Sequence, residues 1–201
     1  MITLVILAIT CVVSIVCFGN REWFYRLQFN AYQIVRRKQY YRLISHGFVH
    51  GSWMHLLINM FVFFSFGGIL ESYYAKYAIG GSTAYLALYL LAIPMASILS
   101  LSKHKDDPHY NAVGASGAVN AILFAFVFLD PWRKLYLFFA LPIPGIVFAG
   151  LYLWYSYAMS KKENDGIGHD AHFLGAIFGV IFTAIFIPDS LANFFTRLLD
   201  F

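Results

Sequence analysis

Six long runs of apolar residues are the feature that most limits how this chain can fold. A helix needs about 20 mainly apolar residues to cross a membrane. Hydrophobic residues make up 60% of the 201-residue sequence and charged residues only 12%, whereas soluble domains carry about a quarter charged residues. The sequence therefore predicts an integral membrane protein. The predicted spans are 2–18, 52–70, 78–101, 115–129, 146–159 and 167–187.

We expect one all-α domain over residues 1–201, a polytopic bundle of six transmembrane helices. The apolar runs take up nearly the whole length, which leaves no room for a separate soluble domain. The first run, MITLVILAITCVVSIVCFG, lacks the basic region of a cleaved signal peptide, so we interpret it as a retained helix.

We expect two of the connectors to form more than simple turns. The connector 19–45 mixes arginines with aromatic residues, which is typical of a segment lying in the membrane interface; a plain solvated loop is the alternative. The stretch Leu135–Gly145 contains two prolines, which interrupt a helix. We expect it to be a re-entrant or interfacial lead into the fifth span. That span, beyond Pro144, is a candidate for the helix that gates access.

With six spans, alternate connectors lie on opposite faces of the membrane. Connectors 19–45, 102–113 and 160–166 then share one face, and Ser116, His55 and His172 all lie within a few residues of it. The fourth span is short, because about 15 residues cover roughly 22 Å of a hydrocarbon core near 30 Å thick. If the Ser116 end is the recessed one, water must reach it through a cavity among the other helices.

Several functions find no support in the sequence. The net charge of +4 resides in connectors of a hydrophobic protein, which favours contact with anionic lipid over nucleic acid. No phosphate-binding loop, dinucleotide-binding turn or paired CxxC is present, so no cofactor is expected. His46, His50 and His55 invite a metal hypothesis. The absence of an HExxH motif, and of any acidic residue between Glu22 and Glu71, argues against metal.

An acyl-transfer site fits the polar residues better. A serine hydroxyl needs a base, which a neutral imidazole provides near pH 7, and donors aimed at the developing oxyanion. Ser116 as nucleophile and His172 as base meet the first need. His55 and Asn59, one helical turn apart, and the first-turn amide of Ser116 meet the second. Gly114 and Gly117 would let backbone and substrate approach closely.

Each of these features also has a purely structural interpretation. The small residues of GASG, at 114–117, often serve helix packing, and His172 could simply hydrogen-bond between helices. Gly175 and Gly179 have the GxxxG spacing of tight helix packing. Packing and catalysis are compatible here, because close approach of the sixth span would bring His172 to Ser116.

Taken together, the motifs resemble those of the rhomboid family of intramembrane serine proteases. The resemblance covers almost the whole chain and rests on four motifs in the family's order. They are His46-x3-His50-x4-His55-x3-Asn59, Gly67-Gly68-x2-Glu71, Gly114-x-Ser116-Gly117 and Ala171-His172-x2-Gly175-x3-Gly179. It implies a Ser116–His172 dyad, an oxyanion hole from His55, Asn59 and the Ser116 amide, and cleavage of transmembrane segments near their ends. His46, His50, Gly114, Gly117 and Asn120 would support this site.

Two positions depart from the family pattern. Tyr41-Arg42 replaces a frequent Trp-Arg in the first connector. Asn120, one turn after Ser116, stands where related proteases commonly place a Tyr or Phe against the catalytic imidazole. Asn cannot stack on the ring, although it can form hydrogen bonds.

The resemblance implies a multi-pass protein of the bacterial cytoplasmic (inner) membrane, with the serine opening outward. The positive-inside rule indicates the reverse, because ten of the 14 Lys and Arg residues lie in the connectors on the serine side. We favour the family's orientation, since an embedded first connector does not count as an ordinary loop. The expected partners are lipid and the transmembrane segments of substrates; the oligomeric state stays open.

Two other functions compete with proteolysis. A non-catalytic rhomboid-like protein that binds or escorts membrane helices is supported only by Asn120, and the presence of Ser116 and His172 argues against it. A His-lined metal or proton transporter is the third class.

Overall fold

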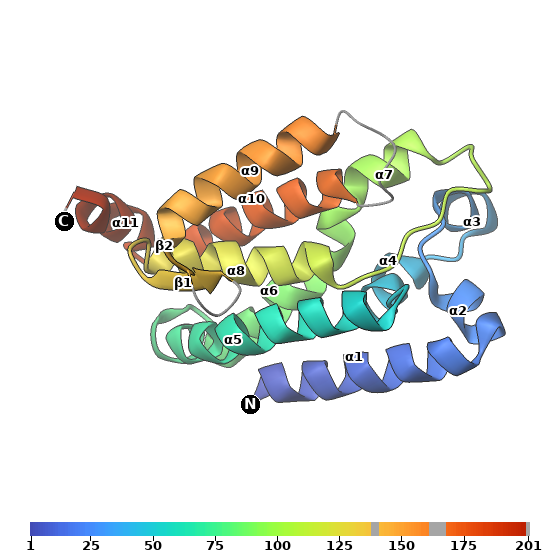
Figure 1. Ribbon diagram of the computed structural model, residues 1–201, viewed down its shortest axis with the longest axis horizontal. Helices are drawn as coiled ribbons and strands as arrows, with labels where there is room; N and C mark the ends of the chain where they lie inside the picture. Colours follow the sequence, from blue (N-terminus) through green and yellow to red (C-terminus); the bar gives the residue numbers. More distant parts are fainter. Residues whose placement is uncertain (138–140, 161–167, 200–201) are drawn as a thin grey trace.

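The computed structural model describes residues 1–137, 141–160 and 168–199 of the chain, which form a bundle of helices (Figure 1). The main helices are α1 (Ile2–Gly19), α5 (Trp53–Tyr77), α6 (Gly81–Ala96), α8 (Ser116–Leu129), α9 (Gly145–Ser160) and α10 (His169–Phe186). Short helices make up much of the first connector: α2 (Arg21–Leu27), α3 (Ala31–Arg37), α4 (Arg42–Ser45) and the 3-10 turn η1 (His46–Phe48). The remaining elements are α7 (Ile98–Lys103), β1 (Lys134–Leu137), β2 (Leu141–Pro144) and α11 (Ser190–Leu199).

The prediction of an all-α membrane bundle is confirmed. Within the described residues, four stretches are long and apolar enough to cross a membrane: Ile2–Gly19, Trp53–Tyr77, Gly81–Lys103 and His169–Phe186. Ser116–Leu129 and Gly145–Met159 are apolar but shorter. These correspond to the fourth and fifth expected spans, so the count of six spans stays a prediction. Helix α10, which corresponds to the sixth expected span, begins at His169. The connector expected at 160–166 and the expected start of that span at 167 fall largely outside the described residues.

Helix α8 is the centre of the bundle. Every residue from Gly117 to Phe128 is buried, and the helix packs against α5, α6, α9 and α10. A helix that is apolar on all sides suits such a position, because no face has to meet water. Its 14 residues correspond to about 21 Å, and Figure 1 shows its Ser116 end inset from the adjacent ends of α1 and α5 along the long axis.

The packing of α8 on α10 brings the two backbones into contact. A Cβ atom added at Gly175 would lie 2.1 Å from the carbonyl oxygen of Gly117, and one added at Gly179 would lie 2.1 Å from that of Ala121. No side chain fits in either place. The GxxxG pair therefore works as the sequence indicates, by allowing two helices to approach more closely than side chains permit.

Helix α1 is attached to α5 through a buried carboxylate. Glu71 accepts hydrogen bonds from the amides of Ile2 (2.7 Å) and Thr3 (2.9 Å) and from the Thr3 hydroxyl (2.8 Å). The first amides of a helix have no partner within it, so Glu71 caps α1 from the neighbouring helix.

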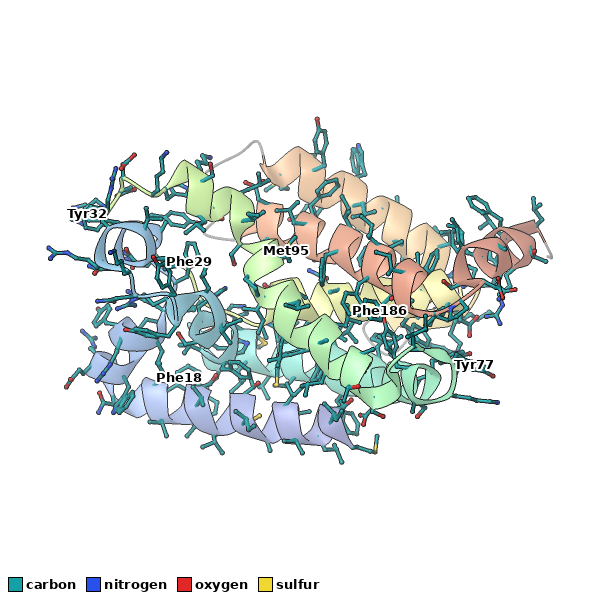
Figure 2. The ribbon with its side chains drawn as sticks, turned by 180° about the vertical axis from the view of Figure 1, so that it is seen from behind. Phe18, Phe29, Tyr32, Tyr77, Met95 and Phe186 are labelled. Atoms are coloured by element: carbon teal, nitrogen blue, oxygen red, sulfur yellow. The ribbon has the colours of Figure 1, made fainter. Side chains whose placement is uncertain are left out.

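The first connector is a folded platform at one end of the bundle. Arg42 is buried and donates to the carbonyl oxygens of Tyr25 (2.9 Å) and Gln28 (2.8 Å). Phe29 pairs with Ala112 through two backbone hydrogen bonds, which join the connector to the segment that leads into α8. Figure 2 places Phe29 among these short helices, at the opposite end of the molecule from Tyr77. The alternative prediction of a plain solvated loop is therefore wrong. The position of this connector in the membrane interface stays a prediction.

The stretch Leu135–Gly145, expected as a re-entrant or interfacial lead into the fifth span, contains two strands that precede α9, and its position in the membrane interface stays a prediction. Strands β1 and β2 pair as an antiparallel ladder, with Lys134 opposite Pro144; residues 138–140 lie outside the described part. The C-terminal helix α11 is a further element that the apolar runs did not indicate. Phe194 stacks on Phe128 of α8 with ring centroids 5.0 Å apart, so α11 covers the far end of the central helix.

The backbone contact between α8 and α10 predicts an unequal response to two glycine substitutions. Gly179→Ala should destabilise the protein by about 1–3 kcal/mol or more, because the new methyl group meets a backbone oxygen that cannot move independently. Gly150→Ala on α9 is the matched control, since nothing lies within 4 Å of the added Cβ. Thermal unfolding in one detergent should show a lower Tm for Gly179→Ala alone. Equal Tm values would contradict the close packing.

Candidate active site

Ser116 is held at the first position of α8 by the segment that precedes it. Gly114 has φ +129°, a conformation that favours glycine. Its amide donates to the carbonyl oxygen of His46 (3.0 Å), and the amide of Ala115 donates to Nε2 of His50 (3.4 Å). The path of the chain into Ser116 is thus set by two histidines that lie between α4 and α5.

His46 and His50 are buried structural groups in this arrangement. His46 donates from Nδ1 to the carbonyl oxygen of Arg42 (2.8 Å), and its Nε2 lies 3.0 Å from the Ser97 hydroxyl. His50 Nδ1 lies 2.9 Å from the hydroxyl of Ser14. Burial lowers the pKa of His46 to about 4 and, together with the nearby His55, that of His50 to about 3. Both imidazoles are therefore neutral near pH 7.

Ser116 and His172 meet across the contact between α8 and α10. His172 lies in the first turn of α10, and its Nε2 is 2.8 Å from the Ser116 Oγ, although the residues are 56 positions apart. The close approach at Gly175, one turn after His172, makes this distance possible. A hydroxyl in contact with an imidazole nitrogen is the arrangement from which the proton can be removed.

His55 and Asn59 flank the same point from α5. A Cβ at Gly114 would lie 2.7 Å from Cε1 of His55, so the ring packs directly on the glycine before Ala115. Asn59 is buried and donates one amide hydrogen to the carbonyl oxygen of His55 (2.9 Å). An Asn side chain has two such hydrogens, which leaves a donor in addition to this bond.

A single cavity of about 970 Å³ joins these groups. Ser116, His172, His55, Asn59 and Asn120 all lie on its wall. The structure thus brings together the residues that the sequence singled out, from three helices. Among the residues described, no group of three or more His, Cys, Asp or Glu side chains has the geometry of a metal site.

Asn120 contacts a residue that sequence reasoning did not identify. Its Nδ2 donates to the hydroxyl of Tyr152 on α9 (2.9 Å). The Tyr152 ring stacks on that of His172, with centroids 6.4 Å apart and planes at 27°. Tyr152 lies in an apolar run that also contains Tyr155 and Tyr157, and no spacing or motif distinguishes it from them.

The buried histidines predict a specific loss of stability in acid. The unfolded chain takes up a proton on His46 near its ordinary pKa of 6.5, whereas the folded protein does so only near about 4. The free energy of unfolding should therefore fall as the pH drops from about 6.5 to about 4. Thermal unfolding of His46→Asn over this range should show a weaker pH dependence than the wild type. His109→Asn, at an exposed position, should keep the wild-type slope; an unchanged slope in His46→Asn would contradict the role of burial.

Comparison with known proteins agrees with this geometry. A family model described as Rhomboid domain matches residues 37–189, which include all the residues of the site. RHOMBOID-like protein 12, mitochondrial, of Arabidopsis thaliana is 29% identical over 148 residues, which are 69% of this chain and 44% of that protein. Rhomboid-related protein 1 of Caenorhabditis elegans is 29% identical over 152 residues, 73% of this chain and 40% of the relative.

The third relative matches over most of both chains. Rhomboid protease GlpG of Haemophilus influenzae is 30% identical over 158 residues, which cover 78% of this chain and 74% of that protein. The first two relatives are matched over less than half of their own length. The matched family model, the apolar helices and these relatives together show that the chain is an integral, multi-pass membrane protein and belongs to the rhomboid family.

Proposed function

We propose that the protein is an intramembrane serine endopeptidase that cleaves peptide bonds in or near transmembrane segments of other membrane proteins. The observation that carries this proposal is the 2.8 Å separation of Ser116 Oγ and His172 Nε2 on the wall of a cavity. The relative named Rhomboid protease GlpG supports the same activity.

In the proposed mechanism, His172 acts as the general base and then as the general acid. Nε2 takes the proton of the Ser116 hydroxyl while Oγ attacks the carbonyl carbon of the scissile bond. The resulting imidazolium gives that proton to the leaving amine, and the acyl group stays on Ser116. A water molecule, deprotonated by the same imidazole, then attacks the ester, and the proton returns to Oγ as the acid is released.

The oxyanion formed in each step would lie among donors from α5 and α8. The amide of Ser116 is in the first turn of α8, where it has no partner within the helix and where the helix dipole favours negative charge. His55 packs against Gly114 and Asn59 is buried one turn further along α5. Donors held in place before the reaction stabilise developing charge without reorganisation. His46 and His50 support the site indirectly, by fixing the segment before Ser116.

The alternative is a non-catalytic protein that binds or escorts membrane helices. In the sequence only Asn120 supports this function, and this residue contacts Tyr152 while His172 stays in contact with Ser116. An intact serine–imidazole contact has no evident purpose in a protein that only binds helices. We therefore retain this function as the second candidate, to be separated from the first by experiment.

A fluorophosphonate probe tests the nucleophile directly. The wild type should be labelled and should cleave a transmembrane substrate, whereas Ser116→Ala and His172→Ala should lose both activities while keeping the wild-type Tm. Ser102→Ala, in the exposed part of α7, is the matched control and should be labelled normally. Cleavage by pure Ser116→Ala protein, or no labelling of the wild type, would exclude this mechanism.

We further propose that the protein resides in a bacterial cytoplasmic membrane, with the Ser116 end of the bundle facing outward. The extent of the match to GlpG supports a bacterial membrane, although two relatives carry mitochondrial names. In a chain without Cys11 and Cys17, a membrane-impermeant maleimide applied to intact cells should label Lys105→Cys. It should spare Arg133→Cys at the other end of the bundle. The reverse pattern would show that the positive-inside rule prevails.

A further inference from the structure

Tyr152 carries a role that neither the sequence motifs nor the family match assigns. We propose that Tyr152 is a positioning residue for the His172 imidazole and that Asn120 holds Tyr152 in place. This inference rests on the proposed function, because it concerns how the base of that reaction is oriented. It also accounts for the Asn at position 120, which cannot stack on an imidazole itself.

The first observation is the contact between the two rings. The planes of Tyr152 and His172 are inclined by only 27°, with centroids 6.4 Å apart, within the range of offset aromatic pairs. The imidazole therefore has Ser116 at its Nε2 edge and a phenol ring beside its face. A ring bounded in this way has fewer rotamers available, which keeps Nε2 directed at the hydroxyl.

The second observation is that the Tyr152 ring is itself fixed. Asn120 donates to its hydroxyl at 2.9 Å, and Asn120 is buried, with 6% of its surface exposed. The ring also packs between Phe124 of α8 (5.7 Å between centroids) and Phe148 of α9 (5.6 Å). Asn120 lies one turn after Ser116 on α8, so one hydrogen bond ties the helix of the nucleophile to the ring beside the base.

The third observation is that the ring beside His172 comes from α9. The side chain at position 120 is short, so α8 provides the hydrogen-bond donor and α9 provides the aromatic ring. Helix α9 packs on both α8 and α10, which allows a single side chain to touch Asn120 and His172 together. Support for the imidazole thus depends on a third helix, in addition to the two that carry the serine and the histidine.

Kinetics of fluorophosphonate labelling test the proposal without a known substrate. Measuring the labelling rate at several probe concentrations separates the binding constant of the probe from the first-order rate of its reaction with Ser116. Tyr152→Leu should lower this rate by roughly tenfold or more, with the binding constant unchanged. Tyr152→Phe keeps the ring and should recover part of the rate, to within about threefold of the wild type. Trp154→Leu removes an aromatic ring from the same helix at a position that is 70% exposed, and it should match the wild type.

The role of Asn120 is tested by a double-mutant cycle. Asn120→Leu and Tyr152→Phe each remove the same hydrogen bond, so each should slow labelling by about threefold. The double variant should be no slower than either single variant, because only one interaction is lost. Asn120→Leu keeps the number of side-chain heavy atoms and Tyr152→Phe removes a single oxygen, so the cycle remains informative if Tyr152→Leu does not fold.

Each result has a defined consequence. A wild-type labelling rate in folded Tyr152→Leu, a change confined to the binding constant, or additive losses in the cycle would overturn the positioning role. All three outcomes require that the wild type is labelled at Ser116, and so they leave the proposed protease function intact. Absence of labelling in the wild type would instead refute the proposed function.

Discussion

The backbone contact between α8 and α10 is the interaction on which the rest of the site depends. At Gly175 and Gly179 the two helices are too close for a Cβ atom between them. This closeness sets the depth and the rotation of α10 against a helix that is buried on every side. His172 lies one turn before Gly175, and its 2.8 Å distance to Ser116 follows from the same contact. In a membrane, where lipid tails are as apolar as side chains, close packing of this kind replaces hydrophobic burial as the force that joins helices.

Around this contact, several buried polar groups are held by hydrogen bonds within the protein. His46 and His50 stay neutral because burial disfavours their charged forms. The carbonyl oxygen of His46 and Nε2 of His50 accept hydrogen bonds from the two backbone amides just before Ser116. Arg42 donates hydrogen bonds to carbonyl oxygens of the first connector. Glu71 accepts hydrogen bonds from the first backbone amides of α1. Unpaired polar groups are costly away from water, so these bonds fix the platform and the helix ends in one arrangement. The candidate site is thereby held in one arrangement without a bound ligand.

The position of the site follows from the short length of α8. A helix of 14 residues, about 21 Å long, cannot match its longer neighbours at both ends. Its Ser116 end is inset from the ends of α1 and α5 (Figure 1), and residues of α5, α10 and the first connector line the cavity around it. The proposed hydrolysis needs water at the Ser116 end of α8, and a cavity of about 970 Å³ with polar groups on its wall provides room for it. The chain thus combines an apolar exterior with a polar interior at one end.

The sequence by itself predicted the membrane class, the helical fold and the small-residue contact, because hydropathy and helical spacing are local properties of the chain. It also singled out Ser116, His172, His55 and Asn59 as candidate site residues, through four short motifs that resemble those of the rhomboid family. Only the tertiary structure decided which ring supports His172, that Arg42 is buried, and that two paired strands and α11 close the other end. Asn120 and Tyr152 are 32 residues apart, and several tyrosines of α9 would satisfy the same pattern. Which of them meets Asn120 depends on how α9 is rotated against α8 and α10, and that rotation is set by packing between helices, which no single segment encodes.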